Sequence, residues 1–425
     1  MISKKISLIF LFLLFINNSL VNCFAPPKYD YSQYNTKYFN ESLTNGQISQ
    51  DADDASIFTF IKYVEKFGNQ DDFSIKDVLI MKTGKSTKME NTLSYCINSA
   101  VLVSGHFLDF HRSQATTNDE GAFALCATNE GDLSIINSTV STMGKNSIAV
   151  YLTDSSSFSG KNSYFSTIGE NSPALSSNGF KSISLTNCSL YTSKKGSPLI
   201  QTNGGLYLTQ TFGWARNSHA MIIDASTFVE IQKNSILNCT WEDNGDTVDA
   251  SVVLIKNTSD HQIGDSDFIY FHLDNSTIET NSQIAPAIII DRAKVNINMN
   301  NANIKSKIFL KVKNAEQQID LFMRNSNVEG EIIADEKSKI NIQLMSSNFT
   351  GAINPDGKAG FINYYMDKRS SLTLTGNSNF DEYYNDDQTQ ANVFKNSFTM
   401  GGVEDSSNHL YFSQLMFILL VYLLI

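Results

Sequence analysis

The 425-residue sequence predicts an all-β fold, a right-handed parallel β-helix (β-solenoid) of roughly ten rungs with an N-terminal cap. The first observation is a sequence repeat: "NSTVSTMGKNSIAV" at 137–150 is followed by the similar stretches "NSYFSTIGENSPAL" and "NCSLYTSKKGSPLI". The second is the alternation of apolar and polar residues in stretches such as "GDLSIINSTV" and "KSISLTNCSL". The third is that no helical apolar pattern of useful length interrupts residues 131–380.

The repeat has a nearly constant length. Ser147, Ser172, Ser197 and Ser218 each precede an apolar run, at spacings of 25, 25 and 21 residues. Each unit holds two or three short strands joined by Asn/Gly/Ser turns. One such unit cannot bury its apolar face, so successive units must stack on one another.

The alternation also assigns the two sides of each strand. Leu133, Ile135 and Val140 are predicted to point inward, with Ser, Asn or Thr outward. The recurring Asn and Ser/Thr positions predict polar ladders at the corners. A β-propeller would need units of about 40 residues with four strands each, and a β-sandwich would lack this periodicity.

Composition divides the chain into five segments. We expect a signal peptide at 1–23, a leader and N-terminal cap at 24–90, the β-helix at 91–380, an acidic stalk or cap at 381–406, and a hydrophobic C-terminal anchor signal at 407–425.

The N-terminal segment has the features of a secretory signal. Lys4 and Lys5 precede an apolar run from Ile6 to Ile16, and a V-x-C site predicts cleavage after Cys23. The run is short for a membrane span, and an N-terminal anchor is the alternative.

The C-terminal segment closes on an apolar run, Leu415–Ile425, shorter than the ~20 residues of a spanning helix. Small residues, a polar spacer and this tail match a GPI-attachment signal with Ser406 as the lipid attachment site. A short C-terminal transmembrane helix is the alternative. Both readings place the protein at a membrane, on the extracellular side of the plasma membrane.

N-glycosylation motifs (sequons) also support the prediction that the protein is secreted. The chain contains N-x-S/T at seven positions outside the signal, which are expected glycosylation sites: Asn40, Asn137, Asn187, Asn238, Asn257, Asn275 and Asn348. A formal charge of −11 argues against nucleic-acid binding, because no basic stripe is present to neutralise phosphates.

Four cysteines remain after the predicted cleavage: Cys96, Cys126, Cys188 and Cys239. In an oxidising compartment they predict one or two disulfides, of three alternative pairings. Isolated buried thiols are the alternative. The absence of C-x-x-C spacing argues against a zinc site.

Two inserted loops carry the densest acidic residues. A candidate Ca²⁺ site or sugar-binding rim is formed by Glu242, Asp243, Asp246 and Asp249, and the next loop holds Asp260, Asp265 and Asp267. Trp241 and Trp214 are candidate sugar-stacking rings. The alternative for the acidic residues is a solvated loop. No other cofactor is implied.

Catalytic motifs are missing from the sequence. Trp214, Arg216 and His219 form the most chemically varied spot in the repeats, yet one Arg and one His do not make an active site. His106 and His111 have no metal-ligand spacing and are expected at turns or on the surface.

The stretch 326–380 and the middle, 121–223, resemble the rungs of bacterial β-helical surface proteins. The matching residues are Gly330, Ile332, Asp335, Ser338, Ile342, Thr350, Gly351, Ile353, Asn354, Asp356, Leu372, Leu374, Gly376 and Ser378. The resemblance covers about two thirds of the chain, and its motifs are structural. It implies a pectin-lyase-like, adhesin-like or carbohydrate-binding protein. The eukaryote-type signal, the sequons and the anchor tail depart from that family.

These observations together predict a non-catalytic, adhesin-like or glycan-binding protein on the surface of a eukaryotic cell, in a protist or fungus. Its expected partners are the membrane, glycans or surface proteins. A polysaccharide lyase or hydrolase would place carboxylates or Arg/Lys on consecutive rungs of one face. A purely structural coat protein would have evenly polar faces.

Overall fold

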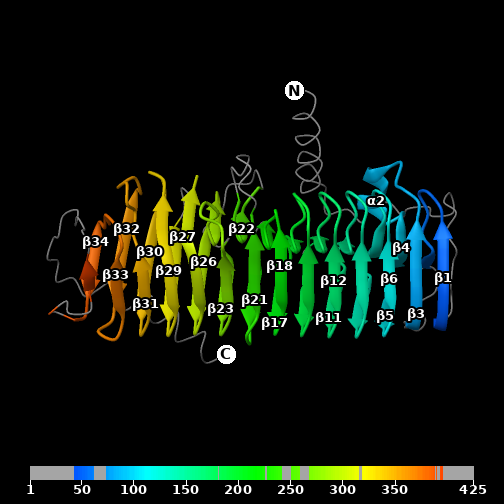
Figure 1. Ribbon diagram of the computed structural model, residues 1–425, viewed down its shortest axis with the longest axis horizontal. Helices are drawn as coiled ribbons and strands as arrows, with labels where there is room; N and C mark the ends of the chain where they lie inside the picture. The colour runs from blue at the N-terminus through cyan, green and yellow to red at the C-terminus, as the bar shows by residue number, and fades with distance from the viewer. Residues whose placement is uncertain are drawn as a thin grey trace, which may run out of the picture.

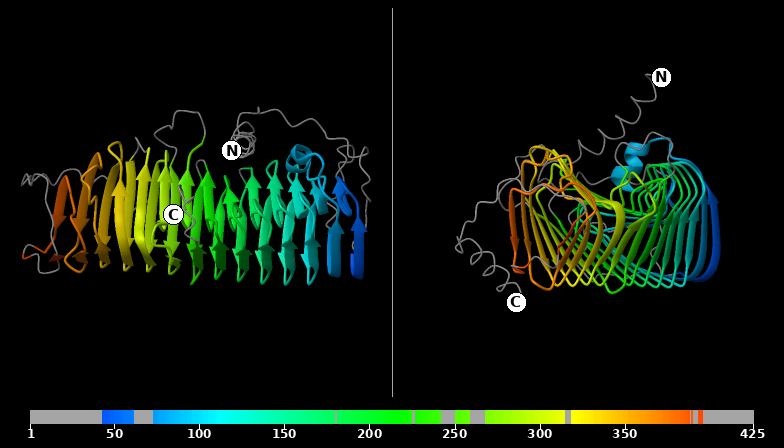
Figure 2. Two further views of the ribbon diagram at one scale, coloured as in Figure 1. Left: turned by 45° about the horizontal axis from the view of Figure 1, so that its top comes forward. Right: turned by 60° about the vertical axis from the view of Figure 1, so that its left-hand side comes forward.

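The computed structural model describes residues 43–61, 73–179, 181–224, 227–241, 250–258, 268–314, 318–387, 389 and 393–395. Within these residues, parallel strands form one elongated stack of rungs (Figures 1 and 2). Each strand lies in register against the equivalent strands of the neighbouring rungs, as β11 does between β8 and β14. The predicted parallel β-solenoid is confirmed.

The rungs supply strands to three sheets, and the last rungs, from β30 on, supply strands to sheets I and II alone. Sheet I contains β5 (Phe107–His111), β8 (Asp132–Ile136), β11 (Ser157–Lys161), β14 (Ile183–Thr186), β17 (Leu206–Thr209), β20 (Phe228–Gln232), β23 (Ile269–Asp274), β26 (Val295–Asn300), β28 (Gln318–Arg324), β30 (Lys339–Met345), β32 (Phe361–Met366) and β34 (Glu382–Asn385). Sheet II contains β6 (Gln114–Thr117), β9 (Thr139–Thr142), β12 (Tyr164–Thr167), β15 (Ser189–Thr192), β18 (Phe212–Arg216), β21 (Ile236–Thr240), β24 (Thr277–Thr280), β31 (Asn348–Gly351), β33 (Ser371–Leu374) and β35 (Val393–Lys395). Sheet III contains β2 (Phe58–Ile61), β4 (Ser99–Ser104), β7 (Phe123–Thr128), β10 (Val150–Thr153), β13 (Leu175–Asn178), β16 (Ile200–Thr202), β19 (Met221–Asp224), β22 (Val253–Lys256) and β25 (Ile288–Asp291).

Four longer strands bend across a corner and serve two sheets. Sheets I and II share β1 (Leu43–Asp51) and β3 (Phe73–Thr83), because β3 pairs with both β5 and β6. Sheets II and III share β27 (Asn303–Lys313) and β29 (Asn327–Ala334).

The parallel array extends past both boundaries predicted for the β-helix. Strands β1 and β3 lie in the segment 24–90 that was expected to be a leader and cap. At the other end, β34 and β35 lie beyond residue 380 and pair with β32 and β33. The predicted signal peptide and the anchor signal at 407–425 fall outside the described residues.

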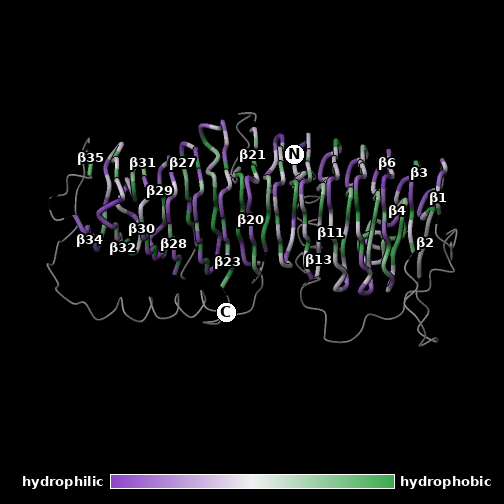
Figure 3. The backbone as a smooth tube through the Cα atoms, turned by 90° about the horizontal axis from the view of Figure 1, so that it is seen from below, coloured by the Kyte–Doolittle hydropathy of each residue, from purple (hydrophilic) through white to green (hydrophobic). Residues whose placement is uncertain are grey.

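The core lies inside the three sheets, where inward side chains from successive rungs stack in columns. Leu133, Ile135 and Val140 are at most 2% exposed, as predicted. Leu133 stacks on Phe158, which in turn stacks on Ile183. Figure 3 shows apolar and polar positions alternating along the strands. Each fully buried aliphatic or aromatic side chain contributes about 1.5–3 kcal/mol.

The corner between sheets I and II is built from one residue in the left-handed region. Its φ lies between 44° and 63° in successive rungs, at Arg112, Asn137, Asn162, Asn187, Gln210, Asn234, Asn275, Asn301, Asn325 and Ser346. Asparagine tolerates this conformation better than most residues, which explains why it recurs. The side chains also connect the rungs, because Asn187 Nδ2 donates to Asn162 Oδ1 (2.8 Å) and Asn162 Nδ2 to Asn137 Oδ1 (3.1 Å).

The next residue of most of these corners is a buried serine, replaced by Cys188, Thr211 and Ala302 in three rungs. The backbone N–H of Ser113 donates to Ser138 Oγ (3.1 Å), and that of Ser138 donates to Ser163 Oγ (3.1 Å). The same pattern continues from Ser326 to Ser347 to Ser370. These residues form the corner serine ladder.

A second ladder runs along the corner between sheets II and III. The backbone N–H of Ser147 donates to Ser172 Oγ, and that of Ser172 donates to Ser197 Oγ, both at 3.0 Å. These are the serines that mark the sequence repeat. The polar ladders predicted for the corners are therefore confirmed.

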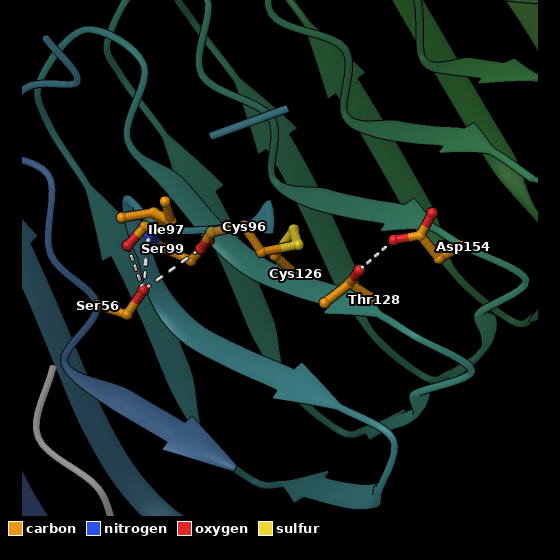
Figure 4. The surroundings of a disulfide bond; sticks show 7 residues. All are labelled: Ser56, Cys96, Ile97, Ser99, Cys126, Thr128 and Asp154. Atoms are coloured by element: carbon orange, nitrogen blue, oxygen red, sulfur yellow. Dashed lines mark hydrogen bonds between the residues drawn. A yellow bond between two sulfur atoms is a disulfide. The ribbon is translucent and has the colours of Figure 1, made fainter. Parts of the chain in front are cut away.

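A small apolar cluster lies outside the solenoid, on the outer side of sheet III. Helix α2 (Met89–Tyr95) packs against Leu102, Phe123 and Tyr151, and a disulfide joins Cys96 to Cys126 (Figure 4). Ser56 Oγ donates to Cys96 O (3.3 Å) in the same region. This cluster attaches the helix to the side of the first rungs.

One inward position of β3, near the N-terminal end of the solenoid, is occupied by a lysine instead of an apolar residue. Lys82 is 1% exposed, and its Nζ donates to Ala52 O (2.8 Å) and Thr83 O (3.2 Å). Burial lowers the pKa of Lys82 to about 8, although nearby carboxylates, Asp53 and Asp119 first among them, act to raise it.

We predict that Ser138→Ala lowers the free energy of unfolding by about 1–3 kcal/mol, because the buried N–H of Ser113 loses its acceptor. The matched control is Ser166→Ala, on the outward side of β12, which should change stability by less than about 0.5 kcal/mol. Denaturant unfolding of both variants measures the difference. Equal losses would show that the ladder contributes nothing particular to stability.

We also predict a pH-dependent difference between wild type and Lys82→Met. The pKa of Lys82 is lower when folded, so between pH 8 and 10.5 the unfolded chain holds a proton that the folded chain has released. Stability from this group therefore rises with pH across that window. Each pKa unit corresponds to about 1.4 kcal/mol, so wild type should gain about 3 kcal/mol relative to Lys82→Met.

Unfolding curves at pH 7, 9 and 10.5 measure this gain. The exposed neighbour Lys85, changed to Met, is the control and should show no such trend. A pH-independent difference for Lys82→Met would contradict the prediction.

Candidate functional site

The outward face of sheet II carries one of two groups of large exposed side chains. Outward positions of this sheet form columns that run along the solenoid, because the strands pair in register. One column passes through Tyr164, Ser189, Phe212 and Ile236. The adjacent column consists, in order along the solenoid, of Ser166, Tyr191, Trp214, Asn238, Glu279, Lys305, Glu329 and Thr350.

Four rings in these columns form the aromatic surface, defined here as Tyr164, Tyr191, Phe212 and Trp214. Phe212 is 48% exposed, and Tyr164 and Trp214 are each 40% exposed. The rings of Tyr191 and Trp214 meet edge to face, with centroids 5.6 Å apart. Exposed rings that form one contiguous group beside polar side chains are typical of a binding surface.

Strand β18 presents this surface because of its own alternation. Phe212, Trp214 and Arg216 point outward, while Gly213 and Ala215 point inward. A Cβ at Gly213 would lie 2.6 Å from Leu199 Cδ1 and 3.0 Å from Leu237 Cδ2, so the neighbouring leucines fill the core at this point. The small inward residues allow β18 to sit in register while it carries large outward ones.

The aromatic surface passes into polar and charged side chains toward the C-terminal rungs. Asn238 follows Trp214 in its column, and its Nδ2 donates to Glu279 Oε1 (3.0 Å). Lys305 Nζ then lies 4.0 Å from Glu329 Oε2. The charges of this column alternate in sign, so no two carboxylates face each other across adjacent rungs here.

A second group of exposed rings lies on sheet I, across the corner from the aromatic surface. Tyr207, Phe228 and Tyr270 are 37–44% exposed, and the ring centroids of Tyr207 and Phe228 are 5.8 Å apart. The sequence analysis missed these three. Their signal was available, because each is a large ring at an outward position of an alternating strand.

Trp214, Arg216 and His219, which are close in sequence, do not lie together on one face of the structure. Trp214 and Arg216 lie on the outer face of sheet II. His219 lies beyond the turn toward sheet III, where its Nδ1 is 3.0 Å from Ser251 Oγ and its ring meets Trp241 at a centroid distance of 5.5 Å. Trp241 is half-buried against the core, with its indole N–H 3.1 Å from Cys239 Sγ. Only Trp214 of the two tryptophans presents an exposed ring.

The cysteines form one disulfide in this structure, Cys96–Cys126, from adjacent rungs of the N-terminal end. Cys188 and Cys239 are free and buried. Burial raises the pKa of both thiols, that of Cys239 to about 12. Neither thiol is therefore poised for chemistry.

His106 directly precedes strand β5 of sheet I, and His111 is its last residue. The ring of His106 meets Phe73 edge to face at 5.0 Å, and His111 Nε2 lies 3.3 Å from Asn137 Nδ2. Both are half-buried at the edge of the sheet.

The Ca²⁺ candidates Glu242, Asp243, Asp246 and Asp249 fall outside the described residues, as do Asp260, Asp265 and Asp267. In the part of the chain that the structure describes, no group of three or more His, Cys, Asp or Glu side chains is placed to hold a metal.

Acidic residues at the end of sheet III are paired with lysines. Lys256 Nζ lies 3.5 Å from Asp224, and Lys313 Nζ lies 3.4 Å from Asp291. The four residues alternate along the rungs, with each carboxylate neutralised by a neighbour. This arrangement stabilises the edge of the sheet and does not resemble a catalytic pair.

A shallow depression lies at the corner of sheets I and II near the N-terminal end. Arg112 forms two hydrogen bonds to Asp77 there, Nη2 to Oδ2 (2.6 Å) and Nε to Oδ1 (2.8 Å), and these lower the pKa of Asp77. The depression is open, and its two charged side chains already bind each other. It borders the aromatic surface, because its lining residue Thr139 lies one rung from Tyr164.

No helix among the described residues is long and apolar enough to cross a bilayer.

Comparisons with known proteins add little. No family model and no curated protein matches the chain. One solved structure, the catalytic domain of a GH87 alpha-1,3-glucanase variant in complex with nigerose, is similar at 11% identity and a TM-score of 0.23, covering 90% of this chain and 70% of that chain. A likeness this low carries no argument about function.

Proposed function

We propose that this chain is a non-catalytic, adhesin-like glycan-binding protein that acts at a eukaryotic cell surface. The observation that carries the proposal is the aromatic surface of sheet II. Three of its rings, Tyr164, Phe212 and Trp214, are exposed and Tyr191 is half-buried; the four lie on consecutive rungs about 4.8 Å apart, next to Ser and Asn side chains of the same columns. Ring faces beside hydrogen-bonding groups suit the alternating apolar and polar faces of a sugar.

The arrangement favours binding over catalysis. A glycosidase needs two carboxylates across the scissile bond, and a lyase needs a base beside an acidic sugar. The two carboxylates in the column of Trp214 are engaged, since Glu279 accepts from Asn238 and Glu329 lies beside Lys305. A long open face would bind a glycan chain along its length.

The cell-surface part of the proposal rests on the terminal segments of the sequence. A signal at 1–23 and lipid attachment at Ser406 would display the rod outside the cell, joined to the membrane by its C-terminal end. Ca²⁺ is kept in the proposal only as an accessory ion at the acidic loop 242–249.

Trp214→Ala should weaken binding to a glycan at least tenfold, a loss of about 1.4 kcal/mol. The ligand would first be found by screening the secreted protein on a glycan array, and affinities would then be measured by calorimetry. The matched control is Phe228→Ala, which removes an equally exposed ring from sheet I. An unchanged affinity for Trp214→Ala, or an equal loss in both variants, would move the site away from sheet II. A folded protein that binds no glycan would favour a purely structural role.

The proposed lipid anchor can be tested by enzymatic release from cells. When the full chain is displayed on eukaryotic cells, phosphatidylinositol-specific phospholipase C should release a soluble β-rich protein into the medium. Ser406→Leu, which replaces the small residue at the predicted attachment site, should reduce surface display. Retention of the wild-type protein after treatment would favour a spanning tail at Leu415–Ile425.

A further inference from the structure

The sequons are alike in sequence but differ in how the fold holds their side chains. Three of them, Asn137, Asn187 and Asn275, occupy the left-handed position of the corner between sheets I and II. All three are exposed. A fourth, Asn238, lies inside strand β21 in the column of Trp214.

The corner asparagines have space for a bulky substituent. Their side chains project from the ridge where two sheets meet, so a glycan on Nδ2 would extend into solvent. Asn187 Nδ2 donates to Asn162 Oδ1, and a glycosylated amide keeps one N–H. The bond between rungs is therefore compatible with modification.

Asn238 has no such space. Its Nδ2 is committed to Glu279 Oε1 at 3.0 Å, and its Oδ1 is buried without a hydrogen-bond partner. Trp214 flanks it on one adjacent rung and Glu279 on the other. Asn238 is half-buried where the corner asparagines are exposed, so a glycan on its Nδ2 would pass between these side chains and cover the indole of Trp214.

We propose that the folded protein carries N-glycans on the corner asparagines Asn137, Asn187 and Asn275 and none on Asn238. The sugars then form a row along the corner, and the outer face of sheet II remains bare around Trp214. This inference concerns the same surface as the proposed function, yet it depends only on passage through the secretory pathway. The inference can therefore be correct whether or not the protein binds a glycan.

Asn348 is a useful comparison because it is also in a strand of sheet II. It is exposed, and its Nδ2 donates to Asn327 Oδ1 (2.8 Å). Five rungs separate it from Trp214 along the sheet, about 24 Å at 4.8 Å per rung. Exposure, rather than location in a strand, is therefore what separates it from Asn238, and modification there would leave the aromatic surface clear.

The test is site occupancy in the full chain secreted from eukaryotic cells. Enzymatic deglycosylation in ¹⁸O-labelled water followed by peptide mass spectrometry should mark Asn137, Asn187 and Asn275 and leave Asn238 unmarked. Two variants that remove a sequon without touching its asparagine make a matched pair. Ser189→Ala should remove the mass of one glycan, and Thr240→Val should remove none.

Two results would overturn the inference. One is a glycan on Asn238 in folded, secreted protein, seen as a marked peptide or as a mass loss in Thr240→Val. The other is a secreted protein with bare corner asparagines. Since both readouts are masses, neither depends on whether a glycan ligand is ever found.

Discussion

The hydrogen bonds that pass from one rung to the next at the corners are the constraint on which the rest of the structure depends. A parallel strand can satisfy its backbone within a sheet, but the chain must also turn three times in every rung without leaving buried amides unpaired. Here the amides of Ser113, Ser138, Ser147 and Ser172 are satisfied by the hydroxyl of the serine one rung away, at 3.0–3.1 Å. Because the acceptor belongs to the next rung, every turn fixes the register of its neighbour.

This register brings residues at equivalent positions of the repeat together on one surface. With rungs aligned residue against residue, inward positions form apolar columns and outward positions form columns of exposed groups. The inward columns must fill the core, and their members compensate in size: Gly213 follows Leu190, and a Cβ at Gly213 would meet Leu199. The outward columns are free of that requirement. Exposed rings can therefore gather on sheets I and II without cost to the core.

Much of this fold could be predicted from the sequence, because its signals are local and repeated. Alternation identified Leu133, Ile135 and Val140 as core, and the recurring serines at Ser147, Ser172 and Ser197 identified the corners. The ends could not be predicted in this way. Strand β3 bends across two sheets at Asp77, and its buried Lys82 interrupts the apolar pattern that a search for rungs relies on. The rings of Tyr207, Phe228 and Tyr270 were missed because each stands in a different rung and meets the others only in three dimensions.

The candidate site shows the same limit. Trp214 and Trp241 look equivalent in sequence, yet β18 turns the first outward while the second packs over Cys239. The disulfide is a similar case. Cys96 and Cys126 are 30 residues apart, which alone favours no pairing over the others. They meet because β7 lies beside β4 in sheet III and α2 ends next to it.

The equal length of the central rungs has a consequence for how such a gene can change. Residues 132–156 and 157–181 form successive rungs whose strands differ by 25 positions throughout. Loss or duplication of one such block by recombination between similar stretches of DNA would preserve every corner bond. The rod would then shorten or lengthen in steps of about 4.8 Å. The length of the rod could thus evolve by whole rungs while each face keeps its composition.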